Sequence, residues 1–194
     1  MLTKLDIINA MLASTGTAPL TSNDTQHPFF IKASNKLAII NTEIQSKGWW
    51  FNRAIRTLNP DVSGHIVLPS NTLSADPVDR SKQYVIRGNK LYDLPNATNF
   101  IGAPVKVWFV DLVEIADLPP SAAEYLKAAA VASFYLDEDG NALKVNEYNR
   151  AVAAAFVGFK GENLKNADVN WFDGVSYAQQ ARGAGRRRLP VTDE

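Results

Sequence analysis

The densest group of side chains that could do chemistry is the acidic segment 137–141, with the sequence Asp-Glu-Asp-Gly-Asn. Carboxylates beside a glycine occur in calcium-binding loops, where glycine takes the sixth position and carboxylates are required at the first and twelfth positions. When Gly140 is placed at the sixth position, Tyr135 and Asn146 occupy those two positions. The calcium motif therefore fails.

The same three carboxylates could supply the acid and base of a glycosidase. Such a pair requires one carboxyl group whose pKa is raised by burial, so that it can donate a proton. An exposed polar loop offers no burial of this kind. We therefore expect residues 137–141 to form an acidic loop between two helices. No catalytic residue and no metal site are predicted.

A cluster of positive charge near the C-terminus is the second candidate. It consists of Arg182, Arg186, Arg187 and Arg188. Because twenty basic residues balance twenty acidic ones, the chain has no long-range field that would draw it onto nucleic acid or an anionic membrane. The cluster could dock on a partner protein, contact DNA phosphates locally, or keep a C-terminal segment soluble.

Aromatic side chains precede this cluster at Trp171, Phe172 and Tyr177. Aromatic residues are enriched in the hot spots of protein interfaces. They could hold the C-terminal segment on a neighbouring subunit, or pack back on the helices of their own subunit. We include them with the four arginines as candidate partner-binding residues.

The remaining motifs predict no cofactor. His27 and His65 are the only histidines, and neither lies in a metal-ligand spacing or beside a nucleophile motif. Gly183 and Gly185 follow no predicted strand and lack the rest of a dinucleotide fingerprint. The absence of cysteine excludes disulfides, thiolate metal sites and a cysteine nucleophile.

Four stretches have the apolar spacing of amphipathic helices. They run over residues 2–12, 30–44, 120–137 and 145–159. Pro119 and Pro120 suit the first turn of the third helix, which has no internal partner for the missing N–H groups. Its many alanines occupy several faces, which indicates burial on more than one side. Gly158 and Gly161 weaken the second half of the fourth helix.

Between the second and third helices, β-branched and aromatic residues are interrupted by glycine and proline. Gly88 and Asn89 separate the segments 84–87 and 90–93, which predicts a hairpin with a two-residue turn. The alternation of residues 105–109 predicts another strand. Residues 49–58 are predicted to form a strand that leaves the second helix directly.

Together these elements predict an α+β fold. Residues 1–48 and 113–169 form an antiparallel bundle of about four helices, and a small antiparallel β subdomain, residues 49–112, is inserted in its middle. Residues 170–194 form an extended C-terminal arm. The N-terminus predicts no secretion signal and no apolar segment predicts a membrane span, so we expect synthesis in the cytoplasm.

The end of the second predicted helix carries the most specific motif. Gly48 fits the left-handed residue that follows many helices, and Trp49, Trp50 and Phe51 supply the apolar contacts that accompany it. This predicts a rigid aromatic junction that holds the helices and the β subdomain at a fixed angle.

Two motifs carry a family resemblance. Residues 8–16, Ile-Asn-Ala-Met-Leu-Ala-Ser-Thr-Gly, are followed by Pro19, and residues 44–49, Ile-Gln-Ser-Lys-Gly-Trp, are followed by Phe51 and Asn52. In both motifs the chain resembles the tail tubular protein A family. Its members are the head-to-tail ring adaptors of short-tailed bacteriophages of the podovirus type. Weaker similarities lie at residues 84–92 and at Leu118 and Pro119. The resemblance covers about residues 8–136, and the last third departs from it.

The resemblance implies a subunit of a dodecameric ring beneath the portal protein of the virion. A tail nozzle protein of the tail tubular protein B type would attach below, and DNA would pass through the central channel. The β subdomain would contact another tail component, and the C-terminal arm would bind the portal. We expect no enzymatic activity, and a place in the virion tail after synthesis in the host cytoplasm.

Two other hypotheses stay open. The same adaptor could carry an auxiliary polysaccharide or peptidoglycan hydrolase activity, which a buried carboxylate pair facing a cleft would favour. A nucleic-acid-binding module would require a broad basic face, and the balanced charge argues against it.

Overall fold

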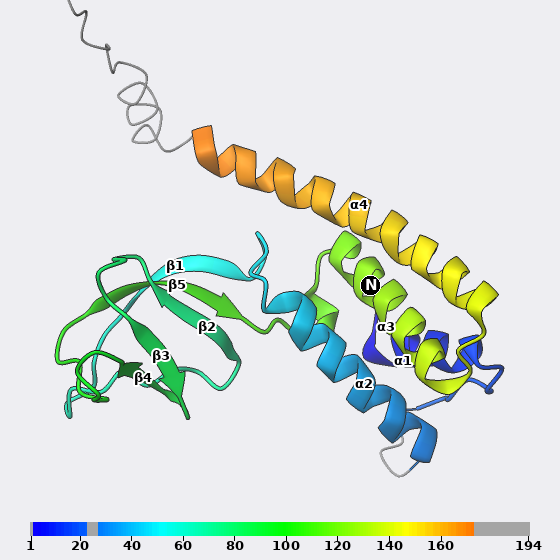
Figure 1. The fold of residues 1–194 in the computed structure, drawn as a ribbon, viewed down its shortest axis with the longest axis horizontal. Helices are drawn as coiled ribbons and strands as arrows, with labels where there is room; N and C mark the ends of the chain where they lie inside the picture. The colour runs from blue at the N-terminus through cyan, green and yellow to red at the C-terminus, as the bar shows by residue number, and fades with distance from the viewer. Residues whose placement is uncertain (1, 23–26, 173–194) are drawn as a thin grey trace, which may run out of the picture.

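Over the described residues the fold combines four α-helices with small antiparallel sheets, and the α+β class expected from the sequence is confirmed (Figure 1). The computed structural model describes residues 2–22 and 27–172, with side chains as far as Asn166. The elements are, in order, α1 (Lys4–Ser14), α2 (Pro28–Gln45), β1 (Arg53–Leu58), β2 (Thr72–Pro77), β3 (Tyr84–Arg87), β4 (Lys90–Asp93), β5 (Val105–Asp111), the short 3-10 helix η1 (Ile115–Asp117), α3 (Pro120–Glu138) and α4 (Ala142–Phe172).

The helices begin at residues that satisfy or remove the free N–H groups of a first turn. Thr3 and Asp6 form a capping box at α1: the Thr3 hydroxyl accepts the Asp6 N–H at 3.2 Å, and the Asp6 carboxylate accepts the Thr3 N–H at 2.8 Å. Both α2 and α3 have a proline in the first turn. The predicted opening of the third helix at its two prolines is therefore confirmed.

Helix α3 lies at the centre of the bundle and contacts α1, α2 and α4 (Figure 1). Its alanines, Ala122, Ala123 and Ala130, are buried, and their small side chains let the neighbouring helices approach closely. The expectation that this helix is buried on more than one side is confirmed. The core also includes Ile7, Ile8, Met11, Leu12, Phe30, Ala33, Leu37, Ile40, Ile44, Leu118, Leu126, Phe134 and Phe159.

The main sheet has the antiparallel order β1-β5-β2, with β5 in the middle. Val105, Val107 and Phe109 of β5 point into a second, separate core, while Trp108 lies on the opposite face. The hairpin of β3 and β4 packs over this core, and its turn uses Gly88 with φ of 62°. The hairpin predicted from the sequence is confirmed.

The strand predicted over residues 49–58 begins only at Arg53. Residues 49–52 form a tight turn in which the Trp49 carbonyl accepts the N–H groups of Asn52 at 3.2 Å and Arg53 at 3.0 Å. The aromatic side chains of this segment pack against the helical core rather than the sheet, which is why the strand starts late.

The acidic segment is also placed differently from the prediction. Asp137 and Glu138 belong to the last turn of α3, and their carboxylates form ion pairs with Lys36 and Lys32 of α2. Only residues 139–141 connect α3 to α4. The prediction of an acidic loop over the whole segment was wrong, because two of its carboxylates have lysine partners on another helix.

Helix α4 is longer than predicted at both ends. It starts at Ala142 and continues through Phe172, so the first residues of the expected C-terminal arm, including Trp171 and Phe172, are helical. Gly158 and Gly161 lie within the helix, and a methyl group added at either would meet no neighbouring atom. The two glycines therefore face solvent and do not interrupt the helix.

Replacing Tyr135 with phenylalanine should destabilise the protein in a pH-dependent way. The hydroxyl of Tyr135 donates a hydrogen bond to the Asp139 carboxylate, and this bond, together with burial, raises the pKa of Tyr135 to about 12. Because the pKa in the folded state lies above the ordinary value, the stabilisation is complete below pH 10 and is lost as the pH rises through the folded value.

Urea unfolding at a series of pH values measures this effect. The free energy of unfolding of Tyr135→Phe should lie below that of the unchanged protein at pH 7 to 9, and the difference should shrink between about pH 10 and 12. Tyr84→Phe, on β3, is the matched control. A difference that does not vary with pH would contradict the assignment.

Candidate junction and assembly surfaces

The junction between the helices and the sheet starts at Gly48, just after α2. Gly48 has φ of 69°, and a methyl group there would lie 3.1 Å from side-chain carbons of both Arg53 and Val110. Its N–H donates to the Gln45 carbonyl at 3.1 Å. Both the backbone conformation and the available space therefore require glycine at this position.

A buried glutamine joins α2 to the chain that follows β5. The side chain of Gln45 is 1% exposed and pairs with both backbone groups of Val113: the Val113 N–H donates to Oε1 at 2.8 Å, and Nε2 donates to the Val113 carbonyl at 2.9 Å. Nε2 also donates to Oδ1 of Asn41 at 2.8 Å. The Gln45 side chain thus forms the two backbone hydrogen bonds with Val113 that a residue of a neighbouring strand would form.

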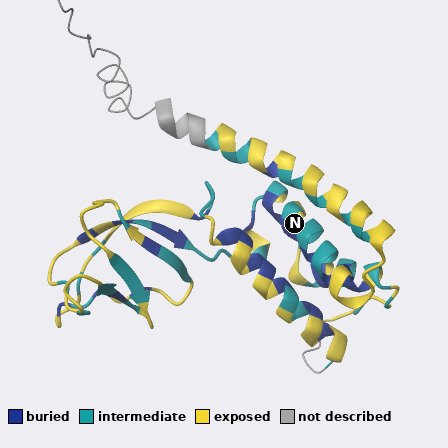
Figure 2. Cartoon of the chain, in the orientation of Figure 1, coloured by how far each residue is buried: buried dark blue, intermediate teal, exposed yellow. Residues whose placement is uncertain are grey.

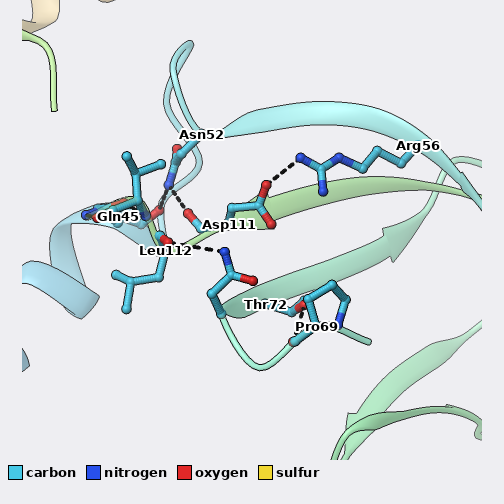
Figure 3. Close-up of polar contacts among 9 residues, drawn as sticks. Gln45, Asn52, Arg56, Pro69, Thr72, Asp111 and Leu112 are labelled. Carbon is cyan, nitrogen blue, oxygen red and sulfur yellow. Dashed lines mark hydrogen bonds and ion pairs between the residues drawn. The ribbon is translucent and has the colours of Figure 1, made fainter. Parts of the chain in front are cut away.

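Asn52 connects three segments at once (Figure 3). Its Nδ2 donates to the carbonyl of Gln45 at 2.9 Å and to the carbonyl of Asp111 at 2.8 Å, while its Oδ1 accepts the Trp49 N–H at 2.8 Å. The backbone carbonyl of Asn52 also accepts the Asp111 N–H at 2.9 Å. The end of α2, the turn and the end of β5 are therefore held by one side chain. We call Gln45, Asn52 and their bonded partners the amide joint.

The sheet side of the amide joint is supported by further bonds (Figure 3). Asp111 forms an ion pair with Arg56 of β1. The next residue, Leu112, donates its N–H to the carbonyl of Asn71 at 2.8 Å. The end of β5 is thus connected to β1 and to Asn71, the residue before β2, and its direction is fixed relative to α2.

An aromatic cluster covers the amide joint on the side of α4. The Phe159 ring, which is fully buried, lies 4.3 Å from the Trp49 ring, 5.4 Å from the Trp50 ring and 6.4 Å from the Phe51 ring, measured between centroids. Tyr125 of α3 stacks on the same ring at 5.3 Å. These five residues and Phe156 form the aromatic cluster. The aromatic cluster attaches α4 to the junction between the helices and the sheet.

Two hydrogen bonds orient the tryptophans within the cluster. The indole N–H of Trp49 donates to the Ile44 carbonyl at 2.7 Å, and the backbone N–H of Trp50 donates to Oδ1 of Asn163 at 3.2 Å. The polar groups of Trp49 and Trp50 are thereby bound to α2 and α4 respectively. The predicted junction residues, Gly48 to Phe51, lie together at this place.

The amide joint itself was not recognised from the sequence. The sequence motif includes Gln45 and Asn52 but predicts no role for either. A signal did exist: Asn41 and Gln45 fall on the same buried face of α2 as Leu37 and Ile44. Polar residues on an apolar helix face indicate a buried hydrogen-bond network.

Helices α2 and α4 lie on opposite sides of the bundle, and exposed residues run along both (Figures 1 and 2). Several of these exposed residues are apolar. On α4, Val157 is 70% exposed, and Leu143 and Leu164 are exposed as well. On α2, Ile39 is 63% exposed and Ile31 is also exposed. Because α3 lies between the two helices, these are two separate apolar faces.

The other candidate residues are partly beyond the described chain. Trp171 and Phe172 lie at the end of α4. Tyr177, Arg182, Arg186, Arg187 and Arg188 are outside the described residues. Over the side chains described, no group of three histidine, aspartate or glutamate residues could hold a metal ion. No helix within the described ranges is long and apolar enough to span a membrane.

Comparison with known proteins gives two matches to this chain. The family model described as "Tail tubular protein" matches residues 5–176, a range that includes every strand and nearly every helical residue described above. The chain is also 31% identical over 137 residues to the curated tail tubular protein A of Klebsiella phage KP34. That alignment covers 71% of this chain and 74% of the relative.

Truncating Asn52 to alanine should lower the free energy of unfolding by about 2–4 kcal/mol, because the Trp49 N–H loses its partner and the carbonyls of Gln45 and Asp111 each lose a hydrogen bond. Asn71→Ala is the matched control: its side chain makes only one long bond of 3.4 Å at an exposed site, so it should change stability by less than about 0.5 kcal/mol. Denaturant unfolding of the two variants measures both values. Equal losses would show that the amide joint has no special contribution.

Phe159→Ala should cost about 3–5 kcal/mol, because it leaves a cavity inside the aromatic cluster. The tryptophan fluorescence should also shift to longer wavelength as water reaches Trp49 and Trp50. Val157→Ala, two residues earlier on the exposed face of the same helix, should change neither quantity appreciably. Unchanged fluorescence in Phe159→Ala would mean that α4 is held elsewhere.

Proposed function

Because the chain belongs to the tail tubular protein family of structural proteins in the phage tail, we propose that it is the ring adaptor linking the portal protein to the tail nozzle. The observation that carries this proposal is the pair of exposed apolar faces on α2 and α4. The bundle already has a complete core of its own, so these faces are available for contacts with other molecules.

The placement of the two faces favours a ring. A contact between the α4 face of one copy and the α2 face of the next joins two different surfaces, and such a heterologous contact repeats until it closes a ring or extends into a filament. The α2 and α4 faces lie on opposite sides of one bundle, so each copy can contact one neighbour through each face. We propose a closed dodecamer with DNA passing through its channel.

The amide joint supports the same role. A ring closes only when every subunit makes the same angle with its neighbour, and the β subdomain of every copy must then point in the same direction. The buried bonds of Gln45 and Asn52, together with the aromatic cluster, fix that direction. The β subdomain is then presented as a rigid body to the nozzle protein, of the tail tubular protein B type.

The C-terminal residues are proposed to bind the portal or a neighbouring subunit. They comprise Trp171, Phe172, Tyr177, Arg182, Arg186, Arg187 and Arg188. The concentration of four arginines within a neutral chain suits an acidic surface on the portal, and planar guanidinium groups bind carboxylates in a bidentate way.

Assembly, rather than catalysis, is the proposed mode of action. Of the three carboxylates considered for a hydrolase, Asp137 and Glu138 are paired with lysines and connect α3 to α2, and Asp139 accepts the hydrogen bond of Tyr135. Asp137 and Glu138 act in the described fold as links between helices.

Electron microscopy of the purified chain, alone and with the portal protein of the same phage, tests the proposal. Rings, or a ring bound to the portal, are expected. Val157→Asp should prevent ring formation without unfolding the chain, because the side chain is exposed and a charge would be buried in the interface. Val62→Asp, at a fully exposed valine of the β subdomain, is the matched control and should leave the ring intact.

Replacing Arg182, Arg186, Arg187 and Arg188 together with glutamine should weaken portal binding and leave the ring intact. A chain that stays monomeric and does not bind the portal would refute the adaptor function, and assays on cell-wall polysaccharides would then be the next step.

A further inference from the structure

The outer strands of the main sheet are β1 and β2, and within the described residues neither pairs with a further strand. Strand β2 contacts the hairpin strand β3, whereas the main contacts of β1 are with β5 alone. Within the described part of the chain, no strand pairs with the outer side of β1. An unpaired edge is a ready template for an additional strand.

The alternation of the β-ladder identifies the free backbone groups. Because the Asn52 carbonyl accepts the Asp111 N–H, the backbone groups of residues 54, 56 and 58 face β5. Residues 53, 55 and 57 therefore direct theirs outward. The Arg53 N–H is bonded to the Trp49 carbonyl, so Ile55 and Thr57 supply the two outward N–H groups.

The arginines of β1 leave this edge uncovered. Charged side chains on an edge strand commonly block further pairing. Here the Arg53 guanidinium lies 4.3 Å from the centre of the Trp108 ring, and the Arg56 guanidinium lies 4.5 Å from the centre of the Phe109 ring on the other face. Arg56 also forms its ion pair with Asp111. Both side chains are thus folded back across their own sheet, away from the edge.

The C-terminal part of the chain supplies a suitable strand. Helix α4 contacts Trp50 and Phe51, immediately before β1, through Phe159 and Asn163, and then continues to Phe172. Residues 173–194 follow beyond the described residues. In this segment, residues 175–179 have the sequence Val-Ser-Tyr-Ala-Gln, a length close to that of β1. In an extended chain, Val175 and Tyr177, both of types that favour strands, would share one face. Residues 175–179 carry no charge that would repel Arg53 or Arg56.

We infer that residues 175–179 of a second copy bind the open edge of β1 as an additional strand. The C-terminal end of α4 lies beyond the end of α3, at the periphery of the subunit, where a second copy could receive the segment that follows (Figure 1). Donor segment and acceptor edge are different surfaces, so the contact repeats from copy to copy. The inference rests on the proposed ring and identifies a second link between its subunits.

Ile55→Pro tests the acceptor edge. Proline removes the outward N–H of Ile55 but none of the bonds to β5, because residue 55 does not face that strand. The concentration at which half of the chains are in rings should rise by about tenfold or more, as loss of a strand contact requires. Ile55→Thr keeps the N–H and should assemble like the unchanged protein. Circular dichroism and melting temperature establish that both variants are folded.

Cysteine cross-linking tests the donor segment. The chain has no cysteine, so Ala54→Cys can be combined with one cysteine at a time at residues 175, 176, 177, 178 and 179. Ala54 lies between the outward bonds, where cross-strand side chains are closest. Disulfides joining two chains should form with alternate residues of the segment, the signature of a paired strand. Val62→Cys in place of Ala54→Cys is the control and should not cross-link.

The outcomes separate this inference from the proposed function. Rings that persist unchanged in Ile55→Pro, or cross-links without alternation, would overturn the strand inference while leaving the adaptor function intact. A disulfide within one chain would overturn the assignment to a second copy. Unchanged protein that neither forms rings nor binds the portal would refute the adaptor function, and the cross-linking result would still decide whether the edge binds this segment.

Discussion

The side chain of Asn52 makes the contact on which the arrangement of the whole molecule depends. It bonds the end of α2, the turn after it and the last residue of β5, three segments that would otherwise meet only through the backbone. Gln45 continues the network to Val113, where the chain returns from the sheet to the helices. The chain leaves the helical core after α2 and returns to it after β5. Both connecting segments are therefore held by the buried side-chain amides of Asn52 and Gln45.

The amide joint and the aromatic cluster contribute differently to the junction between the helices and the sheet. Aromatic rings contribute most of the buried apolar area, but they can stack or tilt in several ways with little change in energy. A buried amide is stabilising only when its donors and acceptors all find partners, so it tolerates few alternative geometries. The aromatic cluster thus supplies the free energy that holds α4 on the junction, and the amide joint selects one angle between the helices and the sheet.

The sequence was most informative where structure depends on near neighbours. The hairpin at Gly88, the proline-initiated helices and the glycine after α2 follow from local backbone preferences, and all lie where those preferences place them. The turn at residues 49–52 was missed because its rings pack on Phe159, far along the chain. The acidic segment was misplaced because its lysine partners lie on α2. For the same reason the roles of Gln45 and Asn52 could not be derived: their partners follow β5 or lie at its end.

Helix α4 gives the junction a mechanical property. The helix is about 46 Å long, and it is held along α3 and again at the aromatic cluster, with the Trp50 N–H bonded to Asn163. Consider a force that pulls its C-terminal end along the helix axis. The ring contacts and hydrogen bonds then resist in parallel, as in shear, instead of separating one after another as in peeling. The rupture force of this attachment should therefore exceed what its equilibrium free energy alone would suggest, and it should fall sharply when the direction of pull is turned across the helix.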